Sequence, residues 1–182
     1  TPQSWICFNY AKSCKDPANK AVHFFVDDYQ FNRLWTNPDA YLDMLRRFKA
    51  VCTPDFSTYT DFPKAVQIWN HYRKHWLGAY WQGNGITVIP TISWSDESSF
   101  EWCFDGEPVG GAVAVSSVGT QLNKRAAELF RLGYDEMLRR LNPSTIYFYG
   151  LVPEGISGPI VHVAAFQEQI KARTTKSKES VV

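Results

Sequence analysis

The feature that most constrains the fold is a regular alternation between short apolar runs and longer segments with helical spacing. The first run, residues 21–26, is almost entirely apolar and stops at Asp27 and Asp28. A strand that is apolar at both odd and even positions is buried on both faces, as parallel sheets require. Runs of this kind recur, and we expect strands at residues 21–26, 50–53, 86–94, 110–115, 144–149 and 159–164.

The segments between these runs have the spacing and the end signals of helices. The clearest helix spans residues 123–141, with Asn123 as its N-cap and Asn142 before Pro143 at its end. A second helix is expected to begin at residue 61 or 63 and to end near residue 82, and its apolar spacing places Trp69 on the buried face. Shorter helices are expected from Asn37 onward and over residues 95–104.

The order of these elements predicts the fold class. Strands that alternate with helices are joined by right-handed crossovers. We therefore predict an α/β fold with a mainly parallel sheet of five to six strands and crossover helices, arranged as a partial barrel or as an open twisted sheet. Pro90 has no N–H to donate, which favours a bulge or a local edge within the third run.

Length and composition fit one domain. A chain of 182 residues can build one sizeable core. We assign the α/β domain to residues 1–170, of which residues 1–20 form an irregular N-terminal segment. Residues 171–182 have almost no apolar side chain to bury, so we expect a flexible tail there.

Charge and cysteine content narrow the choice of partners and of compartment. The chain has 19 basic and 18 acidic side chains, and this balance predicts no basic surface for duplex DNA or anionic lipid. No apolar run approaches the ~20 residues that span a bilayer. The four cysteines lack the spacing of a zinc site, which favours reduced thiols. We therefore expect a cytoplasmic protein without a membrane partner.

Acidic and polar side chains follow the predicted strands, at the edge where α/β proteins bind ligands. Carboxylates that arrive there from different strands can divide acid and base roles or hold a hard cation such as Mg²⁺ or Mn²⁺. The candidate catalytic residues are Asp27, Asp28, Asp96 and Glu97. The candidate substrate-binding residues are Asp55, Trp94, Ser116, Ser117 and Tyr149, with His162 as a further strand-end candidate. The alternative is that the aspartates form turns and helix caps.

Two further patterns occur on the helix that ends near residue 82. His71 and His75 are four residues apart, which is the spacing of metal ligands on a helix. Tyr72 follows His71 where a zinc protease has its glutamate, and we therefore favour a solvated or aromatic-packed helix face. Aromatic and basic residues alternate over residues 69–81, a pattern that could stack single-stranded bases.

Seven short segments together resemble one known family. They are FFVDDY (24–29), PDFS (54–57), QIWN (67–70), LGAYWQ (77–82), IPTISWSDE (89–97), FDG (104–106) and AVSSVG (114–119). On these segments, which cover roughly residues 21–150, the chain resembles the DUF4417 family. The resemblance implies a protein of a prokaryotic cell or of a phage-infected host, in an intracellular setting. It implies no catalytic residues.

Two functional hypotheses follow. The first is an enzyme, a hydrolase or lyase that acts on a small polar, nucleotide-like or sugar-like substrate, with Mg²⁺ or Mn²⁺ as the candidate cofactor. The second is a non-catalytic binding module of a phage or mobile element, for a host protein or single-stranded nucleic acid. An enzyme should gather the strand-end carboxylates in one concave pocket. A module should scatter them and expose a flat aromatic patch instead.

Overall fold

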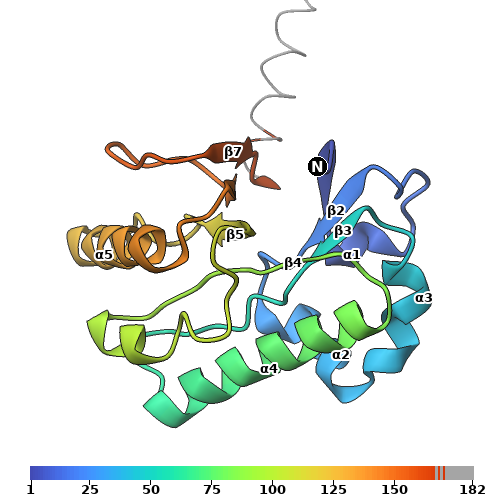
Figure 1. Cartoon of the computed structure of the whole chain (residues 1–182), viewed down its shortest axis with the longest axis horizontal. Coiled ribbons are helices and arrows are strands. Elements are labelled where there is room, and N and C mark those ends of the chain that lie inside the picture. Colours follow the sequence, from blue (N-terminus) through green and yellow to red (C-terminus); the bar gives the residue numbers. More distant parts are fainter. Residues whose placement is uncertain (167, 169, 171–182) are drawn as a thin grey trace, which may run out of the picture.

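Seven parallel strands form two sheets in the computed structural model, which describes residues 1–166, 168 and 170 (Figure 1). The first sheet has the order β1-β2-β3-β4 and the second the order β5-β6-β7. Their bounds are β1 Ser4–Cys7, β2 Lys20–His23, β3 Ala50–Cys52, β4 Val88–Ile89, β5 Ala112–Ser116, β6 Thr145–Tyr149 and β7 Ile160–Val163. The predicted α/β class and the parallel pairing are confirmed.

The predicted single sheet of five to six strands is not what the structure shows. Strand β4 ends at Ile89, just before Pro90, and a lone bridge between Thr91 and Ala114 joins the two sheets. Ala114 donates its N–H to the carbonyl of Pro90 at 2.8 Å, while the ring of Pro90 leaves it no N–H of its own. The missing donor at Pro90 explains why regular pairing is interrupted there.

The N-terminal segment is also more ordered than predicted. Residues 4–7, expected to be irregular, form β1 and pair in parallel with β2, with Ser4 opposite Lys20 and Cys7 opposite His23. The segment is too short for its sequence pattern to reveal a strand, because four residues contain only two full alternations. The predicted tail at 171–182 lies outside the described residues.

Successive residues of β5 and β6 face two different cores. Val113 and Phe148 pack against α5 (Lys124–Leu141) in one cluster. Tyr147 and Tyr149 point the other way and contact the first sheet, with the Tyr147 ring 4.9 Å from the ring of Trp5. Burial on both faces accounts for the unbroken apolar runs.

The remaining helices are mostly short. They are α1 (Phe8–Ala11), η1 (Asp28–Gln30), α2 (Arg33–Thr36), η2 (Pro38–Tyr41), α3 (Leu42–Leu45), α4 (Lys64–Gly83) and η3 (Glu97–Glu101). The predicted bounds of α5 are confirmed, since Asn123 caps it by accepting the N–H of Ala126 at 2.9 Å. In the described part of the chain, no helix is both long and apolar enough to cross a bilayer.

Helix α4 is rotated relative to the prediction. Its exposed face carries Trp69, Tyr72 and Trp76, and Trp69 keeps 47% of its surface exposed. Its buried face contains Trp81, which is completely covered, together with the polar residues Gln67, Asn70 and Lys74. The expectation that Trp69 is buried is therefore wrong. Apolar residues lie on both sides of this helix, so that spacing alone could not choose between them.

Replacing Trp69 with alanine should lower the free energy of unfolding by no more than about 1 kcal/mol, since an exposed ring loses little on truncation. The ring contacts of Trp69 with Trp35 and Tyr72 account for that small loss. Urea unfolding measures the change, with Trp81→Ala as the buried comparison. A larger loss for Trp69→Ala than for Trp81→Ala would contradict the observed orientation of α4.

Candidate functional site

A cleft of about 890 Å³ lies at the carboxyl ends of the strands. Four of the predicted site residues line it: Asp27 beyond β2, Asp55 beyond β3, Trp94 beyond β4 and Ser116 at the end of β5. Their arrival from four consecutive strands follows from the parallel topology, because the carboxyl ends of parallel strands share one edge. The structure thus brings these four residues together in a concave site.

The other predicted carboxylates do not line the cleft. Asp28 accepts hydrogen bonds from the N–H of Ser57 at 3.1 Å and from its hydroxyl at 2.8 Å, and so fixes the loop beyond β3. Asp96 caps η3 by accepting the N–H of Ser98 at 2.9 Å, and the hydrogen bonds from Ser98 hold the pKa of Asp96 below its ordinary value. Glu97 lies 3.4 Å from Arg125 in an exposed ion pair.

The remaining predicted residues also lie outside the cleft lining. Ser117 is buried and donates its hydroxyl to the carbonyl of Leu151 at 2.7 Å. The ring of Tyr149 is buried against Phe25 and His23, and burial raises the pKa of Tyr149. Burial disfavours the charged form of His23 and lowers the pKa of this imidazole to about 4. His162 is exposed and lies 3.3 Å from Glu168.

Trp94 is held in place by α5. Its indole N–H donates to the carbonyl of Leu129 at 3.1 Å, and its ring lies 5.4 Å from that of Phe130. Gly133 leaves the room that this ring occupies, since a Cβ there would come within 2.1 Å of the indole nitrogen. The partly buried ring therefore gives the cleft a fixed apolar wall.

Asp55 is a carboxyl group of the cleft with an unusual pKa. Its carboxylate accepts no hydrogen bond from any residue that the structure describes. Burial raises the pKa of Asp55 to about 7; the charge of Lys74 opposes this rise and that of Asp28 adds to it. Both ionisation states are therefore present at neutral pH, which suits a general acid or base.

A polar face of α4, which was not predicted from the sequence, brings the charge of Lys74 close enough to lower the pKa of Asp55. Gln67 donates to the carbonyl of Phe62 at 2.9 Å, and Asn70 donates to the carbonyl of Ser57 at 2.6 Å. Lys74 is 2% exposed and continues the same face one turn later. Polar residues recur at positions 67, 70 and 74, which is a helical spacing, and this pattern could have predicted a polar buried face.

Lys74 forms a buried ion pair with Glu107. Its ammonium group donates to Glu107 Oε1 and to the carbonyl of Thr91, each at 2.8 Å. Burial alone would raise the pKa of Glu107, but Lys74 and His75 outweigh it and hold that pKa below its ordinary value. Gly106 adopts a φ of +75°, which favours glycine, and this turn carries Glu107 over α4.

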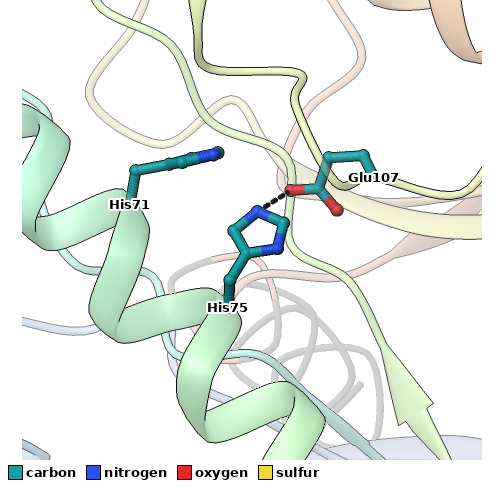
Figure 2. Close-up of side chains that lie close together, drawn as sticks. All are labelled: His71, His75 and Glu107. Atoms are coloured by element: carbon teal, nitrogen blue, oxygen red, sulfur yellow. Dashed lines mark ion pairs between the residues drawn. The ribbon is translucent and has the colours of Figure 1, made fainter.

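His71 and His75 lie beside this ion pair (Figure 2). Their ring centroids are 4.3 Å apart, and His75 Nε2 is 3.0 Å from Glu107 Oε1. Burial, reinforced by the charges of Lys74 and His75, lowers the pKa of His71 to about 3. His71, His75 and Glu107 form the one group of three acidic, histidine or cysteine residues, among those described, that is close enough to share a metal ion. The predicted strand-end carboxylates do not form such a group.

Comparison with known proteins places the chain in a family. Residues 1–167 match the family model described as "Domain of unknown function (DUF4417)". The chain belongs to the DUF4417 family. This membership confirms the resemblance drawn from the seven segments, and the match extends beyond them at both ends.

Relatives of this DUF4417 chain occur in phages. It is 48% identical over 130 residues to the Gene 1 protein of Mycobacterium phage L5, covering 71% of this chain and 57% of that protein. It is 45% identical over 130 residues to the Gene 1 protein of Mycobacterium phage D29, covering 71% of this chain and 48% of that protein. The chain thus spans about half the length of these curated relatives. No solved structure matches it significantly.

Proposed function

We propose that this DUF4417 chain is an acid–base enzyme, a hydrolase or lyase that acts on a small polar substrate in the strand-end cleft. The observation that carries the proposal is Asp55, a carboxyl group with a pKa of about 7 in a cleft of about 890 Å³. A nucleotide-like or sugar-like molecule fits such a volume. The phage relatives support a setting in the cytoplasm of a prokaryotic or phage-infected cell.

Each residue of the cleft has a separate role in the proposed reaction. Asp55 transfers the proton, to a leaving group when protonated or from an attacking water or carbon acid when ionised. Asp27 and Ser116 bind polar substrate groups, and the Trp94 ring packs against the face of a base or sugar. Asp28 acts indirectly, through its hydrogen bonds to the loop that carries Asp55.

The remaining predicted residues have positioning roles in the proposal. Asp96 and Glu97 fix the start of η3, close to Trp94 in the chain. Ser117 and Tyr149 pack beneath the strand ends and keep the floor of the cleft rigid.

A thermal-shift screen followed by product analysis tests the proposal. Wild type and Asp55→Asn are screened against nucleotides, sugar phosphates and other small polar metabolites. Each compound that stabilises both proteins is then incubated with each protein, and NMR measures its conversion to product. Wild type should convert at least one of them, and Asp55→Asn should be slower by about 10²–10⁴-fold. Asp16→Asn, at an exposed position outside the lining of the cleft, should keep the wild-type rate. Binding without conversion by wild type would contradict an enzyme.

One observation favours a second candidate, a binding module for a host protein. Trp69, Tyr72 and Trp76 are exposed side by side on α4, and the Trp35 ring lies 5.4 Å from both tryptophans. Exposed aromatic clusters of this kind mark protein interfaces. A nearly balanced net charge gives less support to nucleic acid. Fluorescence anisotropy with labelled oligo(dT) distinguishes a protein partner from a nucleic-acid partner. Saturable binding that Trp69→Ala weakens would favour nucleic acid.

A further inference from the structure

We propose that His71, His75 and Glu107 form a binding site for a divalent transition metal, and that Zn²⁺ is the ion that this set of donors favours. None of the three residues lines the cleft or takes part in the proposed acid–base chemistry. The metal site is therefore a second site, whose existence does not depend on the proposed function.

The backbone already places the three side chains around one point. His71 and His75 are on successive turns of α4, so that both imidazoles project from the same face. The loop after η3 carries Glu107 across that face, and Figure 2 shows the carboxylate directed toward the histidines. The potential donor atoms of all three residues lie within 4.8 Å of one another. Ligand atoms around a tetrahedral zinc ion are about 3.3 Å apart, so small side-chain rotations complete the site.

The contact between His75 and Glu107 is an ion pair without the geometry of a good hydrogen bond. His75 Nε2 is buried and lies 3.0 Å from Glu107 Oε1, but the two atoms are not aligned for a hydrogen bond (Figure 2). A nitrogen and an oxygen at that distance are about as far apart as two ligands of one zinc ion. A metal ion bound to both atoms would give the buried nitrogen a well-aligned partner.

The surrounding residues also fit a metal site. The carbonyl of Asp105 lies 3.3 Å from His71 Nε2, the kind of contact that orients a coordinating imidazole. Lys74 Nζ donates to Glu107 Oε1 at 2.8 Å and so holds the carboxylate in place beside the histidines. The positive charge of Lys74 repels a bound cation, which limits the affinity to a moderate value.

The donor set selects the class of metal. Two imidazoles and one carboxylate are ligands suited to Zn²⁺ and other divalent transition metals, whereas Mg²⁺ and Ca²⁺ prefer ligands that are all oxygen. Three protein ligands leave a fourth position for water or another ligand. His75 and Glu107 line a cavity of about 590 Å³, which provides a path by which the ion can enter.

Titration of chelator-treated protein with Zn²⁺ and Co²⁺ tests the site. Elemental analysis after dialysis should find one Zn²⁺ bound per wild-type chain. The melting temperature of the wild type should be higher with added Zn²⁺ than without it. Bound Co²⁺ should give visible bands typical of nitrogen and oxygen ligands. His71→Gln and His75→Gln should each weaken binding by at least about tenfold.

His162→Gln is the matched control, since His162 is also paired with a glutamate, Glu168, at 3.3 Å. This variant should bind Zn²⁺ as wild type does, and circular dichroism should show all variants folded. A wild type that retains no metal would overturn the proposal. So would unchanged binding by the double variant His71→Gln/His75→Gln, or a cobalt–thiolate charge-transfer band, which would assign the metal to cysteine. A negative result here would not contradict the proposal for Asp55, because that proposal rests on the residues of the cleft.

Discussion

The Lys74→Met variant should lose about 3–5 kcal/mol of unfolding free energy, because it leaves a buried carboxylate without its cation. The side chains of Lys74 and Glu107 are only 2% and 1% exposed, and their charged atoms are 2.8 Å apart. Methionine fills the same volume as the lysine stem, so the loss reports the unpaired charge rather than a cavity. Urea unfolding at neutral pH measures it.

An exposed ion pair provides the control for this variant. Lys64 and Glu101 are 3.0 Å apart, but their side chains are 57% and 73% exposed. Lys64→Met should therefore cost less than about 1 kcal/mol. The double variant Lys74→Met/Glu107→Met should recover most of the stability, since it removes both buried charges. Equal costs for Lys74→Met and Lys64→Met would show that Glu107 is not buried as described.

Asp55→Asn should make the protein more stable at pH 8, by up to about 4 kcal/mol, which is the free energy of a pKa rise from 3.8 to about 7. In the folded chain burial keeps Asp55 protonated at pH values where the unfolded chain has already released the proton. Wild-type stability from this group is thus fully present below pH 4 and is lost as pH rises toward 7. Asparagine resembles the neutral acid and avoids the loss.

The pH dependence of the difference is the decisive measurement. Urea unfolding of wild type and Asp55→Asn should give asparagine an advantage of about 1.5 kcal/mol at pH 5, which grows to about 4 kcal/mol at pH 8. The neighbouring charges on Lys74 and Asp28 are unchanged between the two proteins. Asp16→Asn, at an exposed position, should show no advantage at either pH. An Asp55→Asn effect that is the same at both pH values would contradict a raised pKa.

The strand-end cleft was predicted in part. Parallel strands bring their carboxyl ends to one edge whatever their register, and for this reason Asp27, Asp55, Trp94 and Ser116 were found from sequence alone. Which of them has perturbed acidity was not predictable. The pKa of Asp55 depends on burial and on Lys74, a residue 19 positions further along the chain.

The sequence by itself determined the α/β class and the ends of α5, because apolar runs, Asn123 and Pro143 act through local backbone geometry and hydrogen bonding. Only the tertiary structure decided which face of α4 is buried. Aromatic and polar residues both recur at helical spacing on that helix, so periodicity offered two solutions. The polar face is buried because Glu107, Thr91 and the loop beyond β3 supply its partners from distant parts of the chain. Burial of polar groups is favourable only where such partners meet them, and that meeting is a property of the fold.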